Sequence, residues 1–154
     1  MDRLASGLLA VGLKPGDRLG IWGPNSHEWY ITQWAAAKAG LILVNINPAY
    51  QPAELEYCLN KVGIRGLVSS QRFKTQDYVG MIGKVAPELK GSKAGELRSE
   101  TVKSLEKVIL MDEGLYNHAD YVSMTFILFY FSRWSYSTHS TRRTSNSLFA
   151  ISTP

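Results

Sequence analysis

Residues 13–59, LKPGDRLGIWGPNSHEWYITQWAAAKAGLILVNINPAYQPAELEYCL, alternate between short apolar runs and segments of helical spacing. Residues 18–22 predict a strand. The apolar run 41–46 is rich in branched residues and predicts a second strand, buried on both faces. Between them Ser26 is a suitable helix N-cap. After the second strand, Pro52 suits a first helical turn and Gly63 suits a left-handed helix end.

The flanking sequence continues this alternation. Residues 4–11 have helical spacing and stop at Gly12, and residues 65–69 and 105–111 predict two more strands. Residues 73–85 predict a weaker helix that contains Gly80 and Gly83, and residues 90–101 predict a polar surface loop. Four strands separated by helices predict the α/β class, as a partial doubly wound parallel sheet with right-handed crossovers.

Composition excludes several classes of function. The chain has 154 residues, 45% of them hydrophobic and 19% charged, which suits one globular domain. Its net charge is +4, but lysine and arginine are spread along the chain, so no nucleic-acid partner is expected. The lone Cys58 fits a reducing compartment and an inert thiol in a helix. His27, His118 and His139 are too scattered for a metal site.

Several short motifs occur together in this sequence. They are Gly16-Asp17-Arg18, Trp22-Gly23-Pro24-Asn25-Ser26, Ala39-Gly40, Asn47-Pro48 and Glu54-Leu55-Glu56-Tyr57. In combination they resemble the opening of an AMP-forming acyl-CoA synthetase of the adenylate-forming superfamily, and within it the mitochondrial medium-chain branch. The resemblance runs from Asp2 to about Asp112 and implies part of the N-terminal domain of such an enzyme.

The resemblance implies a parent enzyme that joins a medium-chain fatty acid to AMP and then passes the acyl group to CoA. ATP, Mg²⁺ and CoA are the cofactors of that parent, and the mitochondrial matrix is its implied compartment. No transit peptide is recognisable at the start of this chain, which leaves the cytosol open, and both ends are expected to be truncated relative to the parent.

The phosphate-binding motif of the family, T-S-G-T-T-G-x-P-K-G, has no match in this sequence. Residues 12–16 are nearest in composition, but they precede a strand, where a plain turn is expected. We therefore assign no catalytic, cofactor-binding or metal residue, expect no cofactor for this chain, and expect it to be inactive alone. A free-standing nucleotide-binding domain lacks its glycine-rich turn for the same reason.

Three further groups of residues admit a structural and a functional interpretation. Asn25 and Ser26 can cap a helix or bind an anion, and capping is favoured. Glu54 and Glu56 point to different faces of a helix, so they do not form an acid–base pair. The tryptophans are expected to pack in the core or between helices rather than to stack on bases. This expectation concerns three of the four tryptophans, namely Trp22, Trp29 and Trp34.

The composition changes after Asp112. Residues 1–112 are predicted to be an incomplete AMP-dependent synthetase domain, and residues 113–154 an aromatic and Ser/Thr-rich tail. That tail can be an alternative exon or read-through, a divergent structural segment, or an interfacial anchor. Its apolar run is shorter than the ~20 residues that span a bilayer. The competing function is a non-enzymatic interaction module, or a truncated isoform that pairs with the full-length enzyme.

Overall fold

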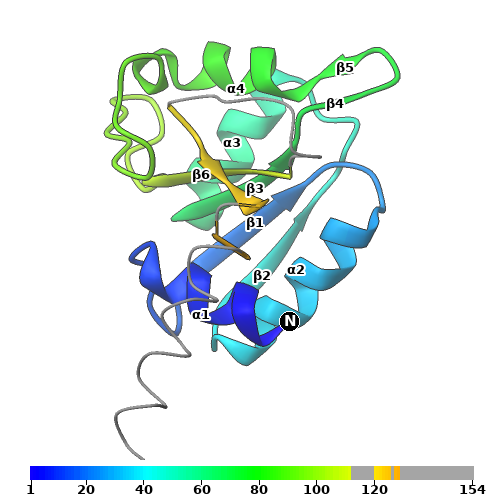
Figure 1. Cartoon of the computed structure of the whole chain (residues 1–154). Coiled ribbons are helices and arrows are strands. Elements are labelled where there is room, and N and C mark those ends of the chain that lie inside the picture. The colour runs from blue at the N-terminus through cyan, green and yellow to red at the C-terminus, as the bar shows by residue number, and fades with distance from the viewer. Residues whose placement is uncertain (112–119, 126, 129–154) are drawn as a thin grey trace, which may run out of the picture.

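The computed structural model describes residues 1–111, 120–125 and 127–128. A five-stranded parallel sheet lies between two layers of helices, which confirms the predicted α/β class and parallel, doubly wound arrangement (Figure 1). The helices are α1 (Asp2–Ala10), α2 (His27–Lys38), α3 (Pro52–Val62), α4 (Tyr78–Val85) and the 3-10 turn η1 (Pro87–Leu89). The strands of the sheet are β1 (Arg18–Trp22), β2 (Ile42–Ile46), β3 (Gly66–Ser70), β6 (Lys107–Met111) and β7 (Val122–Ser123).

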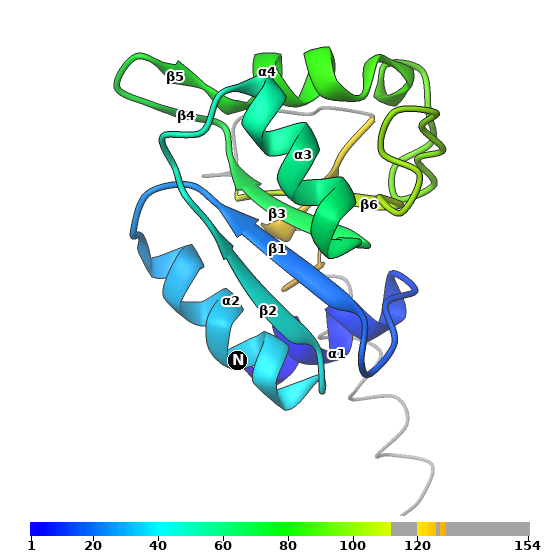
Figure 2. The same ribbon diagram turned by 180° about the vertical axis from the view of Figure 1, so that it is seen from behind.

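The strands lie in the order β2-β1-β3-β6-β7. Strand β1, the second in this order, pairs Leu19 with Leu43 of β2 on one side and with Gly66 of β3 on the other. Helices α1 and α2 cover one face of the sheet, and α3 and α4 cover the opposite face (Figure 2). The chain therefore winds in both directions from β1, because the crossover through α2 and the crossover through α3 use opposite faces.

Each face of the sheet carries its own apolar core. On the α1 and α2 side, Leu8 and Ile21 are fully buried. On the α3 and α4 side, Trp22, Leu59 and Ile82 are buried at 1% exposure or less. Burial of such side chains is worth about 1.5–3 kcal/mol each, so both layers of helices are held by the sheet rather than by helix propensity alone.

Helix termini follow the signals in the sequence. The Ser26 hydroxyl accepts a hydrogen bond from the backbone N–H of Trp29 at 3.2 Å, as an N-cap does. Gly63 ends α3 at φ 70°, ψ 51°, which confirms the predicted left-handed cap. At the start of α3, Gln51 and Glu54 form a capping box in which Glu54 Oε2 accepts from Gln51 N at 2.7 Å.

Strand β2 corrects one prediction. It was expected to be buried on both faces, but it lies at the edge of the sheet, where β1 is its one partner among the described strands. The side chain of Ile42 is 51% exposed, and Leu43 and Val44 are only half-buried. Its branched residues indicate strand formation, whereas its place in the sheet is decided by the crossovers on either side.

The predicted helix over residues 73–85 is wrong in its first part. Residues 72–77 form a small antiparallel hairpin of β4 (Arg72–Phe73) and β5 (Gln76–Asp77). Lys74 takes a positive φ of 52° at its tip. Helix α4 starts only after Asp77, whose carboxylate accepts from Gly80 N at 3.2 Å. This aspartate cap sets the start of the helix.

The tryptophans differ from one another. Trp22 is fully buried and Trp29 is partly buried against the core, as predicted. Trp34 is 47% exposed and contacts the ring of Tyr30 edge-on, with centroids 6.3 Å apart. The expectation of a packed position is therefore wrong for Trp34, because it lies on the face of α2 that points away from the sheet.

An ion-pair cluster joins the amino ends of three strands. Arg65 Nη1 lies 3.3 Å from Asp17 Oδ2, and Arg65 Nε lies 3.1 Å from Glu106 Oε1. These residues immediately precede β3, β1 and β6. The guanidinium can hold both carboxylates because its planar fork donates in several directions.

Candidate functional site at the carboxyl ends of the strands

In parallel α/β sheets, ligands bind beyond the carboxyl ends of the strands, where the crossovers diverge to opposite faces. Here that point lies between β1 and β3, because α2 leaves β1 on one face and α3 enters β3 from the other. Gly23 follows β1, and Ser69 and Ser70 end β3. These residues are therefore the first to test for a site.

Gly23 and Ser70 meet so closely that no ligand lies between them. A Cβ atom at Gly23 would collide with Ser70 Oγ. Ser69 is fully buried and its hydroxyl donates to the carbonyl of Ser70 at 3.0 Å, while Ser70 Oγ lies 3.8 Å from Met111 Sδ. Both hydroxyls are occupied by groups of the chain itself.

The loop after β2 is held by two aromatic side chains. Trp22 Nε1 donates to the carbonyl of Asn47 at 3.0 Å, and the Tyr78 hydroxyl donates to the carbonyl of Pro48 at 3.1 Å. The two rings meet edge-on with centroids 4.7 Å apart. Burial also raises the pKa of Tyr78. The Asn47-Pro48 motif therefore has a structural role, because its carbonyls accept hydrogen bonds from Trp22 and Tyr78, which lie in distant segments of the chain.

The N-terminus of α2 already holds an acidic side chain. The pKa of Glu28 is lowered, first by a hydrogen bond from the Ser26 hydroxyl and then by its own backbone N–H. A carboxylate in the first turn is favoured by the helix dipole and competes with any external anion. Capping by Ser26 is confirmed, and this helix end is not an open anion site.

The other candidate residues are also structural. Glu54 serves the capping box of α3, a role the sequence signals by glutamate three residues after Gln51. Cys58 is half-buried in α3, and burial raises the pKa of its thiol, which disfavours a reactive thiolate. Near the first glycines, Lys14 N donates to Asp17 Oδ2 at 2.7 Å, which forms the expected turn before β1.

His27 starts α2, and His118 and His139 lie outside the described residues. In the part of the chain that the structure describes, no three His, Cys, Asp or Glu side chains come together as a metal site. Over the same residues, no helix is long and apolar enough to cross a membrane.

The comparisons with known proteins agree with this architecture. The family model of the AMP-binding enzymes matches residues 1–123, and the chain therefore belongs to the AMP-binding enzyme family. The predicted resemblance is confirmed. The medium-chain acyl-CoA ligase ACSF2, mitochondrial, of Rattus norvegicus is 53% identical over 115 residues, which cover 75% of this chain and 19% of that protein. The Homo sapiens protein of the same name is 50% identical over the same shares.

A solved structure gives the same fold at lower identity. Acetoacetyl-CoA synthetase from Streptomyces lividans matches with a TM-score of 0.65 and 18% identity, over 82% of this chain and 18% of that one. The anthranilate CoA ligase AuaEII, in complex with anthranoyl-AMP, matches with a TM-score of 0.61 and 21% identity, over 82% and 20%. The chain shares its fold with the N-terminal domain of these ligases and spans about a fifth of the length of its curated relatives.

Proposed function

We propose that this chain is a structural portion of a medium-chain acyl-CoA ligase and does not by itself catalyse acyl adenylation. Its identity to the rat ligase over 115 residues supports the relationship. In the relatives, those residues are 19% of the protein. The parent activity is activation of a fatty acid with ATP followed by thioester formation with CoA. On this proposal, that activity requires a chain that also carries the remaining segments of the ligase.

The proposal that this chain alone does not catalyse adenylation rests mainly on the crevice between β1 and β3, which is filled by side chains of the protein. ATP, bound with Mg²⁺, needs backbone N–H groups and positive charge around its phosphates. The residues that fill this crevice, Gly23, Ser69 and Ser70, are not basic, and the two hydroxyls contact the carbonyl of Ser70 and the sulfur of Met111. They do not fit a triphosphate or the phosphates of CoA. The phosphate-binding motif of the family has no counterpart in the sequence either.

Exchange of pyrophosphate into ATP tests this proposal, because the exchange reports acyl adenylate formation without requiring CoA. We expect the purified chain with octanoate and Mg²⁺ to show only background exchange, while the full-length rat relative in the same buffer is the positive control. Exchange that depends on octanoate and scales with the concentration of this chain would contradict the proposal.

We further propose that the ligase-like domain covers residues 1–112 and that residues 113–154 have a separate origin. The shift to an aromatic and Ser/Thr-rich composition supports this boundary, whereas the family match to residue 123 and the pairing of β7 with β6 favour a later one. Sequencing full-length transcripts across the codon for Asp112 tests it. A longer transcript that lacks codons 113–154 and continues in frame into T-S-G-T-T-G-x-P-K-G supports the separate origin, whereas a longer transcript that keeps codons 113–154 and then continues into that motif contradicts it.

We place the protein in the mitochondrion on the names of its relatives, which are described as mitochondrial. A protease-protection assay on isolated mitochondria from the source cells tests this. Recovery of the chain in the cytosolic fraction alone would reject it. An interaction module remains the second candidate function, and the open edge of β2 is the observation that favours it.

A further inference from the structure

Among the residues that the structure describes, no strand pairs with the outer edge of β2. Ile42 N donates to the carbonyl of Asp17 at 2.9 Å, so residues 42, 44 and 46 direct their backbone groups towards β1. Because backbone direction alternates along a strand, Leu43 and Asn45 direct their N–H and C=O groups outward. Natural edge strands usually carry lysine, proline or a bulge against pairing, and residues 42–46 contain none of these.

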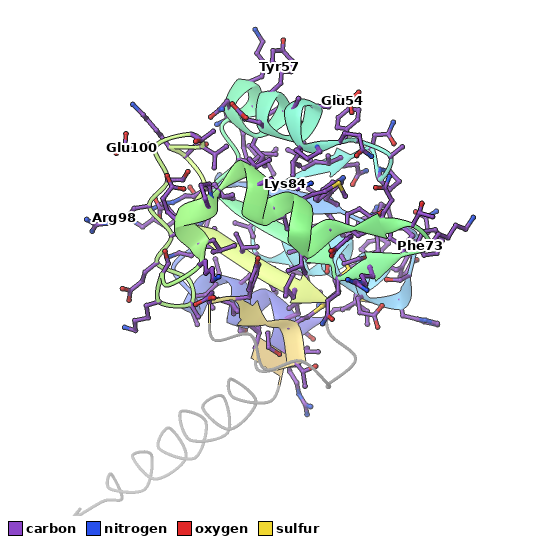
Figure 3. The ribbon with its side chains drawn as sticks, turned by 90° about the horizontal axis from the view of Figure 1, so that it is seen from above. Glu54, Tyr57, Phe73, Lys84, Arg98 and Glu100 are labelled. Carbon is purple, nitrogen blue, oxygen red and sulfur yellow. The ribbon has the colours of Figure 1, made fainter. Side chains whose placement is uncertain are left out.

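A mostly apolar groove continues this edge on the α3 side of the sheet. It has a volume of about 430 Å³ and is lined by Tyr50, Tyr57, Cys58 and Val62 among others. Tyr57 is 67% exposed, whereas Val44 of β2 packs with Cys58 on the same core. Figure 3 shows Glu54 and Tyr57 on the side of α3 that points away from α4. The groove therefore lies on the α3 side of the sheet, and Val44 of the edge strand packs against the same core as Tyr50, Cys58 and Val62 of the groove.

The charges on this surface are self-complementary. Glu54 and Lys61 line the groove two helical turns apart, with Tyr57 between them. Within the described residues Lys61 forms no ion pair. When two such helices lie antiparallel, Lys61 of each helix faces Glu54 of the other helix, which gives two ion pairs. A two-fold axis produces this arrangement, because it places the same patch on both subunits.

The lengths and directions of β2 and α3 are compatible with a single two-fold axis. Five residues of β2 and eleven residues of α3 each extend about 16 Å, and α3 runs back along the sheet after β2. An axis at Val44 pairs Leu43 with Asn45 of the partner subunit through outward backbone groups. It also brings Tyr57 close to its own copy. We propose that two copies of this chain form a symmetric dimer, β2 edge to β2 edge, with the two α3 helices packed side by side.

The exposed Trp34 and Tyr30 do not belong to this surface, because they lie on the helix layer of the opposite face (Figure 2). The proposal commits to a second copy because the charge pattern and the strand register are each completed by a two-fold axis. It is independent of the proposed function, since a dimer can form whether or not the chain activates a fatty acid.

Sedimentation velocity on the full chain over a concentration series tests the proposal, with Lys61→Glu as the variant. That change places four carboxylates along the interface, and we expect it to weaken dimerisation about tenfold. Lys84→Glu is the matched control. Lys84 is also an exposed lysine in the last turn of a helix, but on α4, so its dimerisation should equal that of the parent. Circular dichroism establishes that each variant is folded.

Mixing two charge variants gives the sharper result. Lys61→Glu and Glu54→Lys should each dimerise poorly alone, and an equimolar mixture should recover the dimer because every facing pair then has opposite charges. Glu54→Lys also removes the capping-box acceptor, so recovery in the mixture distinguishes a lost interface from a damaged helix.

Cys58 reports which surface is used, since it is the single cysteine of the chain and lies in the groove. A short bismaleimide should cross-link the parent and Lys84→Glu into dimers, and Lys61→Glu much less. A chain that is monomeric at all concentrations overturns the proposal. So does a dimer or aggregate that is insensitive to Lys61→Glu, or a monomer that binds only a full-length ligase.

Discussion

Strands β1 and β2 lie side by side in register, yet four of the five residues of β1 are buried and β2 is an edge strand with one buried residue. Ile21 of β1 is fully buried, whereas Ile42 of β2 is 51% exposed. The difference arises from neighbours, because β1 is paired on both sides and β2 on one. An apolar strand is therefore evidence of pairing but not of a central position, and an edge strand of this composition is available for association.

The matched pair Ile21→Ala and Ile42→Ala tests this comparison with the largest expected effect. Ile21→Ala leaves a cavity in the core and should lower the free energy of unfolding by about 3 kcal/mol. Ile42→Ala removes a half-exposed side chain and should cost less than about 1 kcal/mol. Urea unfolding at a concentration where both variants are monomeric gives the two values. Equal losses would mean that β2 is covered in solution.

Gly23→Ala tests how tightly the end of β1 meets β3. The added methyl group collides with Ser70, and we expect a loss of about 2 kcal/mol. The double variant Gly23→Ala/Ser70→Gly removes the colliding hydroxymethyl group and should lose less than the sum of the single changes. Strict additivity in the double-mutant cycle would show that the two residues are not in contact.

Ser26→Ala tests the helix that connects the two strands, and should cost about 1 kcal/mol through loss of the N-cap. Because Ser26 is the first cause of the lowered pKa of Glu28, that stabilisation is present above the ordinary value of 4.5 and is lost as the pH falls through the lowered pKa. Unfolding measured from neutral to acid pH should show the gap between parent and Ser26→Ala closing in acid. A gap that stays constant from neutral to acid pH would show that the cap is not coupled to Glu28.

Tyr78→Phe acts on the loop that ends β2 and has the smallest expected effect. It removes one hydrogen bond to the carbonyl of Pro48 but keeps the ring against Trp22, so the loss should be about 1 kcal/mol or less. The Trp emission spectrum, to which the buried Trp22 and the exposed Trp34 both contribute, should remain that of the parent. A large loss, or a shift to the emission of an exposed indole, would show that the hydroxyl rather than the ring holds the loop.

Local signals in the sequence were sufficient for several elements and not for others. Strand β1 and helix α3 have the predicted bounds, because proline at the start and glycine at the end of α3 act within a few residues. The exposure of β2 depends on which strand pairs on its far side, which no local pattern contains. The hairpin at Lys74 has no glycine or asparagine at its tip, so the usual turn signal is missing.

The candidate site shows the same division. The capping role of Ser26 was predicted from its position before a helical run. The contacts of Trp22 and Tyr78 with the Asn47-Pro48 loop join three segments that are distant in sequence. The cluster of Asp17, Arg65 and Glu106 likewise exists only once three strands are aligned. Such long-range contacts follow from the fold and have no signature in any one segment.

The strand order also determines the order in which the strands can pair while the chain is being synthesised. All strands of the β2-β1-β3 unit are encoded in the first 70 residues, so a nascent chain can assemble them before β6 leaves the ribosome. Until then Arg65 has Asp17 as a partner but not Glu106, and β3 is a second unpaired edge beside β2. Arrival of β6 pairs the free edge of β3 and completes the ion-pair cluster in a single step, so the β3 edge stays unpaired while residues 71–106 are being added.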